Sequence, residues 1–161
     1  MVSRTRRSLL CFALAALVVP TTAPGASEHE LAAVLSRPDA PPGVVFEVVS
    51  GDERQLQSLT PVIKAYARQL RARFPDLEIA LVTHGSEQFS LLSSNAQEYA
   101  TLHSEIEALI EDEKVPVHVC GNHAGWRNNT AEDFPKYIDV APSASGQLSY
   151  YTERGFVLIV L

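Results

Sequence analysis

The sequence predicts a single α/β domain with a five-stranded, mostly parallel sheet that is flanked by helices on both faces. Apolar runs of strand length, rich in β-branched residues, alternate with segments whose apolar residues recur every three or four positions. Alternation of this kind is typical of parallel sheets. With 161 residues, of which 46% are hydrophobic, the chain can bury a core without disulfides or a structural metal.

The expected elements follow one another from residue 43 to residue 161. Turn-forming glycine, proline, serine and asparagine residues separate them, and no repeat or low-complexity tract interrupts them. Strands are expected at 43–49, 77–83, 115–120, 138–140 and 156–161, helices at 56–74, 99–110 and 143–154, a short helix or turn at 86–92, a loop at 121–129, and a short helix opened by a capping box at 130–133.

Residues 1–25 are expected to form an export signal. Three arginines lie within the first seven residues, and the apolar run that follows is shorter than the ~20 residues that a membrane-spanning helix needs. The adjacent pair Arg6 and Arg7 fits either a twin-arginine signal or an ordinary one. Removal of this segment predicts a periplasmic protein with a leader or linker at 26–42, which contains a short helix and carries no chemistry, and a domain at 43–161.

The charge of the chain excludes several classes of partner. The formal net charge is -6, and the expected signal removes three of the basic residues. No basic stripe remains to contact a phosphate backbone, so we expect no nucleic-acid partner and no binding to anionic membrane surfaces, and we also expect no membrane span. Neither a G-x-G-x-x-G nor a P-loop pattern is present, and no cofactor is expected.

Cys120 is the main candidate for a functional residue. Once Cys11 is removed with the signal, it is the only cysteine, so it cannot form an internal disulfide. It is either a small buried hydrophobe or a reactive thiol. Its place at the end of a strand favours the reactive thiol, because backbone N–H groups of the following Gly121 and Asn122 would stabilise a thiolate.

Two histidines are expected near Cys120. His118 shares a face of the strand with Cys120, and His84 follows the neighbouring strand. Two further interpretations stay open: a metal held by His118, Cys120 and His123, although the spacing is unusual, and a thiol hydrolase with Asp52 orienting one of the histidines.

Several short stretches of the sequence resemble the DsrE/DsrF-like family, small α/β proteins of sulfur metabolism. They lie in the family's order and together span the domain, at 45–52, 82–85, 117–122, 132–134, 138–143 and 153–157. The resemblance implies a five-stranded sheet, assembly into homo-oligomers such as trimers or hexamers, and a cysteine at position 120 that carries sulfur as a persulfide.

The leading hypothesis is therefore a sulfur-trafficking protein. Cys120 would accept sulfane sulfur from a thiol or persulfide donor and transfer it to an acceptor thiol, with Gly121, Asn122, His84 and His118 binding the substrate. The alternative is a non-enzymatic oligomer that binds a ligand or a metal at the same edge of the sheet.

Overall fold

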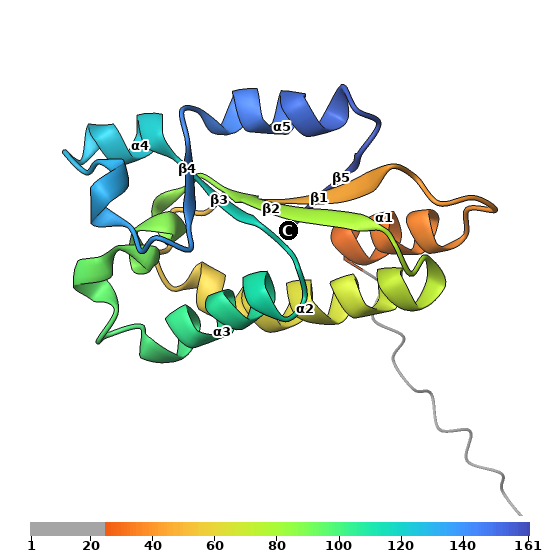
Figure 1. Cartoon of the computed structure of the whole chain (residues 1–161), viewed down its shortest axis with the longest axis horizontal. Coiled ribbons are helices and arrows are strands. Elements are labelled where there is room, and N and C mark those ends of the chain that lie inside the picture. The colour runs from red at the N-terminus through yellow and green to blue at the C-terminus, as the bar shows by residue number, and fades with distance from the viewer. Residues whose placement is uncertain (1–24) are drawn as a thin grey trace, which may run out of the picture.

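Five parallel strands form one sheet at the centre of the computed structural model, which describes residues 25–161 (Figure 1). Their order is β4-β3-β2-β1-β5, and every neighbouring pair is parallel. The expectation of a five-stranded, mostly parallel sheet is confirmed, and the sheet is in fact wholly parallel. The strands are β1 (Gly43–Val48), β2 (Glu78–Thr83), β3 (Val117–Cys120), β4 (Asp139–Ala141) and β5 (Val157–Val160).

The expected export signal falls almost wholly outside the described residues, which include only Gly25 of it. Export therefore stays a prediction. Between residues 25 and 161, no helix is both long enough and apolar enough to span a membrane.

Helices cover both faces of the sheet, as the sequence predicts. Three helices lie against one face, α5 lies across the other, and the short α4 follows β3 directly (Figure 1). The helices are α1 (Ala26–Leu35), α2 (Gln55–Arg73), α3 (Ala100–Glu111), α4 (Gly121–Trp126) and α5 (Ala144–Thr152), with 3₁₀ turns η1 (Ser86–Leu91), η2 (Ser93–Asn95) and η3 (Ala131–Asp133).

The course of the chain places a reversal at the carboxyl edge of the sheet. The chain leaves β1 and β2 toward the face covered by α2 and α3, but it leaves β4 toward the face covered by α5 (Figure 1). In open parallel sheets, a crevice forms at the carboxyl ends of the strands where the connections diverge in this way.

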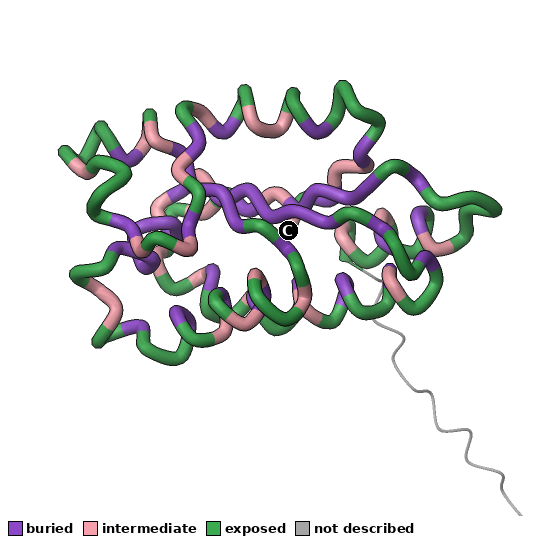
Figure 2. Tube along the Cα trace, viewed as in Figure 1, coloured by how far each residue is buried: buried purple, intermediate pink, exposed green. Residues whose placement is uncertain are grey.

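The two faces bury unequal cores. A large cluster fills the space between the sheet and helices α1 to α3, and its centre includes Phe46, Leu81 and Leu102. A smaller cluster lies between the sheet and α5, and it contains Cys120 together with Val82. The three central strands, β1, β2 and β3, are buried over most of their length between these two layers (Figure 2).

The segment expected as a leader or linker, 26–42, begins with a helix that packs on the domain. Leu31 and Val34 of α1 are buried in the large cluster. The Glu30 carboxylate accepts a hydrogen bond from the Val160 backbone N–H at 3.1 Å, which occupies a donor on the outer edge of β5. The helix therefore belongs to the fold of the domain.

The structure contradicts the expectation of a loop at 121–129, because α4 begins immediately after Cys120. Gly121 and Asn122 indicate a turn when they are considered alone. Contacts with the end of β4 fix the helix instead: the Asn122 N–H donates to the Pro142 carbonyl oxygen at 3.1 Å. A Cβ atom at Gly121 would lie 3.0 Å from the Ala141 carbonyl oxygen, so this close approach favours glycine.

We predict that Leu31→Ala lowers the free energy of unfolding by about 2–4 kcal/mol, because it removes buried contacts between α1 and the core. Urea denaturation would measure the change. The control is His29→Ala on the exposed side of the same helix, which should change stability by less than about 0.5 kcal/mol. Equal effects of the two substitutions would show that α1 is not part of the cooperative fold.

Candidate functional site

A cavity of about 580 Å³ opens at the carboxyl edge of the sheet. Ser50, which follows β1, His84, which follows β2, and Cys120, which ends β3, all line it. The first turn of α5 lines it from the other side. The sequence prediction that these three strand ends meet at one edge is confirmed.

The backbone of Cys120 is clamped by Gln88, which comes from η1. The Cys120 N–H donates to Gln88 Oε1 at 2.8 Å, and Gln88 Nε2 donates to the Cys120 carbonyl oxygen at 3.4 Å. Gln88 is completely buried, and Cys120 is only 7% exposed. The position of the thiol is therefore fixed by a side chain that pairs with its backbone as a neighbouring strand would.

Of the two backbone N–H groups expected to stabilise a thiolate, that of Asn122 has another acceptor. The Asn122 N–H donates to the Pro142 carbonyl oxygen, so it is not free to face the sulfur atom. Asn122 does line the cavity, whereas Gly121 lies against the end of β4. The structure therefore argues against a thiolate-stabilising role for the Asn122 N–H, whereas the same role for the Gly121 N–H stays a prediction.

His84 is held in the cavity by Glu47 of β1. The Nε2 atom of His84 lies 2.8 Å from Glu47 Oε1, and both side chains line the cavity with Cys120. The Nδ1–H of His123 donates to the backbone carbonyl oxygen of His84 at 2.7 Å. Glu47 was not expected from the sequence. The signal in the sequence was that Glu47 is a carboxylate within an otherwise apolar strand. Because side chains alternate between the two faces of a strand, the sequence also places Glu47 on one particular face.

Glu87 joins the ends of β1 and β2. Its completely buried carboxylate accepts hydrogen bonds from Thr83 Oγ1 at 2.5 Å and from the N–H groups of Ser50 (2.7 Å), His84 (3.1 Å) and Gly85 (2.7 Å). A Cβ atom at Gly85 would overlap both Glu87 and the Ser50 backbone. The sequence contains no local signal for this network.

His118 has its predicted face but lies outside the cavity. Its Nδ1 atom lies 2.7 Å from Asp139 Oδ2, and its Nε2 atom lies 2.8 Å from the Tyr151 hydroxyl oxygen under α5. Burial lowers the pKa of His118, and the neighbouring Asp139 carboxylate only partly opposes this effect. A role of His118 in binding substrate is therefore not supported, because both ring nitrogens serve contacts within the fold.

The metal interpretation finds no support in the described part of the chain, where no three histidine, cysteine or acidic side chains gather around a common point. His118 is bonded to Asp139 and Tyr151, and His123 is bonded to a backbone carbonyl. Asp52 also lies apart from the expected hydrolase site: it is exposed, and its carboxylate accepts the Arg54 N–H at 2.9 Å.

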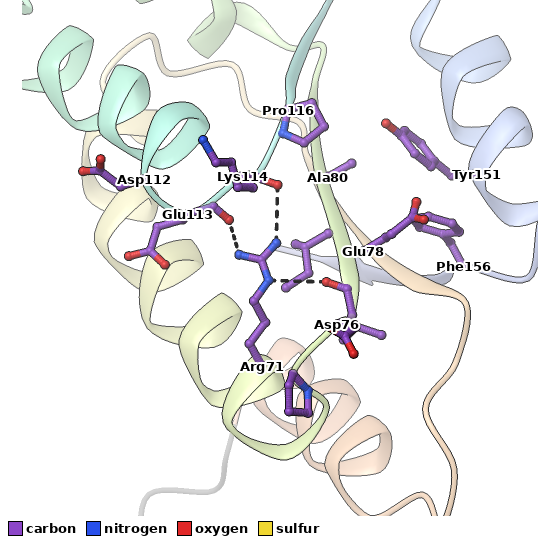
Figure 3. A pocket seen from close by; sticks show the side chains of 13 residues that line it. Arg71, Asp76, Glu78, Ala80, Asp112, Glu113, Lys114, Pro116, Tyr151 and Phe156 are labelled. Atoms are coloured by element: carbon purple, nitrogen blue, oxygen red, sulfur yellow. Dashed lines mark hydrogen bonds between the residues drawn. The ribbon is translucent and has the colours of Figure 1, made fainter.

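A second cavity, of about 510 Å³, lies at the opposite end of the sheet (Figure 3). Arg71 reaches into it and donates to the carbonyl oxygens of Leu77, Glu113 and Lys114. Its guanidinium group thereby satisfies carbonyl groups that follow the end of α3. The guanidinium group of Arg71, the main polar group of this cavity, therefore stabilises the fold.

The fold and the site define a class of protein: a small α/β domain with a wholly parallel sheet and a single thiol at its carboxyl edge. The sequence model of the DsrE/DsrF-like family matches residues 44–161. The chain belongs to this family, which is generally linked to sulfur metabolism.

Two solved structures are similar to this chain at low sequence identity, and the first of them shares its fold. MTH1491 of Methanobacterium thermoautotrophicum, described as a protein of unknown function, is 22% identical over 73% of this chain and 97% of its own, with a TM-score of 0.57. The ychN protein of E. coli is 15% identical over 74% of this chain and 99% of its own, with a TM-score of 0.48. A search of curated proteins gives no match.

We predict that Gln88→Leu lowers the free energy of unfolding by about 1–3 kcal/mol. Leucine has a similar size but leaves the buried N–H and carbonyl groups of Cys120 without partners. Urea denaturation measures the loss. The exposed Gln97→Leu substitution on the same connection is the control and should change stability by less than about 0.5 kcal/mol; a similar loss in both variants would contradict the clamp.

The lowered pKa of His118 predicts a fall in stability on mild acidification. The unfolded chain binds a proton at this side chain near pH 6.5, whereas the folded protein resists it. The contribution is fully present above about pH 6.5 and declines below that value. Unfolding measured from pH 7.5 to pH 5.5 should show a smaller slope in His118→Gln than in the wild type, whereas the exposed His29→Gln should keep the wild-type slope.

Proposed function

We propose that the protein carries sulfane sulfur as a persulfide on Cys120 and transfers it to an acceptor thiol. The observation that carries this proposal is the placement of Cys120, the one cysteine among residues 25–161, in a cavity with the Glu47–His84 pair. A thiol that exchanges sulfur needs access to small molecules and a nearby group that moves protons. Membership of a family linked to sulfur metabolism supports the same chemistry.

Loading is a substitution at sulfur without net oxidation. The Cys120 thiolate attacks the terminal sulfur of a hydropersulfide, R–S–SH, and forms a new S–S bond. The S–S bond of the donor breaks, and its electron pair leaves with the R–S⁻ group, which takes up a proton and departs as a thiol. In the reverse sense, an acceptor thiolate attacks the terminal sulfur of the Cys120 persulfide and regenerates the Cys120 thiolate.

The proton in each step is assigned to His84. Its ring lines the same cavity as Cys120, and the Glu47 carboxylate fixes its orientation at 2.8 Å. A histidine oriented by a carboxylate is a common arrangement for moving a proton to and from a sulfur nucleophile. His84 would protonate the leaving thiolate during loading and accept the proton of the incoming thiol during transfer.

The proposal includes the location and the assembly expected from the sequence. An arginine-containing segment followed by a short apolar run supports export to the periplasm. Members of the family are often oligomeric, which supports a homo-oligomer such as a trimer or hexamer. Trp126, which lines the cavity rim and is 80% exposed, offers apolar surface beside the thiol for a partner.

We expect that incubation with the hydropersulfide of 2-mercaptoethanol adds about 32 Da, one sulfur atom, to the protein. Intact mass spectrometry would measure the addition, which dithiothreitol should reverse because it is a persulfide. Cys120→Ser should show no addition while keeping the wild-type elution volume on gel filtration. An unchanged wild-type mass, together with a thiol that does not react with iodoacetamide, would overturn the proposal and identify Cys120 as a structural residue.

Two histidine variants separate the proton-transfer role from general damage to the fold. His84→Gln should slow loading by about tenfold or more, because it removes from the cavity the histidine that Glu47 orients. His118→Gln is the matched control, since His118 shares a face of β3 with Cys120 but lies outside the cavity. Equal loading rates in the two variants would exclude His84 from the reaction.

A further inference from the structure

The cavity around Cys120 has an unbalanced charge. Among the described residues, its lining includes one carboxylate, Glu47, and no lysine or arginine. The remaining lining consists of serines, glycines, an asparagine, two histidines and apolar side chains. A molecule that reaches the thiol therefore meets one formal negative charge and no permanently cationic group.

Glu47 is placed to affect molecules that approach Cys120. In the parallel register, Glu47 of β1 aligns with Val82 of β2, which aligns with His118 of β3, so Glu47 and Cys120 are separated by one intervening strand. The Glu47 side chain is only 17% exposed. A half-buried charge is screened by salt much less than a surface charge is, so its effect reaches into the cavity.

Arg127 contacts the cavity lining at Ser86, but its charge is already paired with that of Glu53. Arg127 follows α4, pairs with Glu53 at 2.5 Å and donates to Ser86 Oγ at 3.1 Å. Its guanidinium group also lies over the Phe89 ring, 4.0 Å from the centroid. These contacts hold Arg127 on the outer surface, where half of its side chain is exposed to solvent.

We propose that this cavity selects the charge of the sulfur donor and acceptor, and that Glu47 is the discriminating residue. Small thiols and persulfides that are uncharged or cationic beside their sulfur are the preferred substrates, and those that carry a carboxylate or sulfonate are disfavoured. This inference rests on the proposed function, because it names the substrate class of the same site. Two strand spacings of about 4.8 Å separate β1 from β3. For a charge at about 10 Å in a partly solvated site, a preference of about tenfold between cationic and anionic reagents is expected.

Two thiol reagents of matched shape test the selection without requiring sulfur transfer. They are the trimethylammonium-ethyl and sulfonato-ethyl methanethiosulfonates. The Cys120 thiolate attacks the sulfenyl sulfur of either reagent, the S–S bond of the reagent breaks, and methanesulfinate leaves. The two rates are measured at pH 8, above the range in which histidine side chains ordinarily carry a proton, and each is divided by the rate with 2-mercaptoethanol.

The wild type should react about tenfold faster with the cationic reagent after this correction. Glu47→Gln should lower the ratio by about threefold or more, whereas Glu78→Gln should leave it unchanged. Glu78→Gln removes the same charge at the exposed amino end of β2, far from the cavity. Equal changes in the two variants would overturn the assignment to Glu47, because they would reflect the net charge of the protein.

A second measurement needs no variant. In 1 M KCl the wild-type ratio should fall only in part, because a partly buried charge is screened less than a surface charge. A ratio that falls to one in 1 M KCl would assign the selection to surface charges and overturn the role of Glu47, and a ratio of one already at low salt would overturn charge selection. A ratio of one at low salt, found together with normal loading by the hydropersulfide of 2-mercaptoethanol, would reject charge selection and still support the proposed sulfur transfer. Conversely, a tenfold ratio without any persulfide loading would support the selective cavity and reject sulfur transfer.

Discussion

The buried carboxylate of Glu87 is the constraint on which the candidate site depends. A carboxylate that is removed from water destabilises a fold unless hydrogen bonds replace its hydration. Glu87 obtains four of them, from the Thr83 hydroxyl and from three N–H groups that follow β1 and β2. Because one side chain satisfies both loops, the ends of these strands are fixed relative to each other, and the cavity between them has a defined shape.

The next residue, Gln88, extends this arrangement to β3. A single 3₁₀ turn thereby directs two consecutive buried polar side chains at different strands, with Glu87 contacting the ends of β1 and β2 and Gln88 contacting Cys120. In a 3₁₀ turn, adjacent side chains diverge by about 120° around the axis. This divergence allows η1 to organise all three strand ends that line the cavity.

The structure also separates two histidines that the sequence could not distinguish. His84 follows its strand, where the diverging connections leave space, and it lines the same cavity as Cys120 with Glu47 as its partner. His118 lies two residues before the end of β3, where α5 covers the sheet, so Tyr151 and Asp139 occupy its ring. Histidine therefore lines the cavity at position 84, whereas at position 118 it makes contacts within the fold.

The sequence by itself determined the five strands, the helices on both faces and the position of Cys120 at the carboxyl edge, because alternation and helical periodicity are local properties of the chain. Tertiary structure decided what local pattern cannot encode: the contact between Gly121 and β4 that begins α4, and the partners of Glu47 and Gln88. These partners lie 37 and 32 positions away, respectively. Only the parallel register of the folded sheet brings such distant residues within hydrogen-bonding distance.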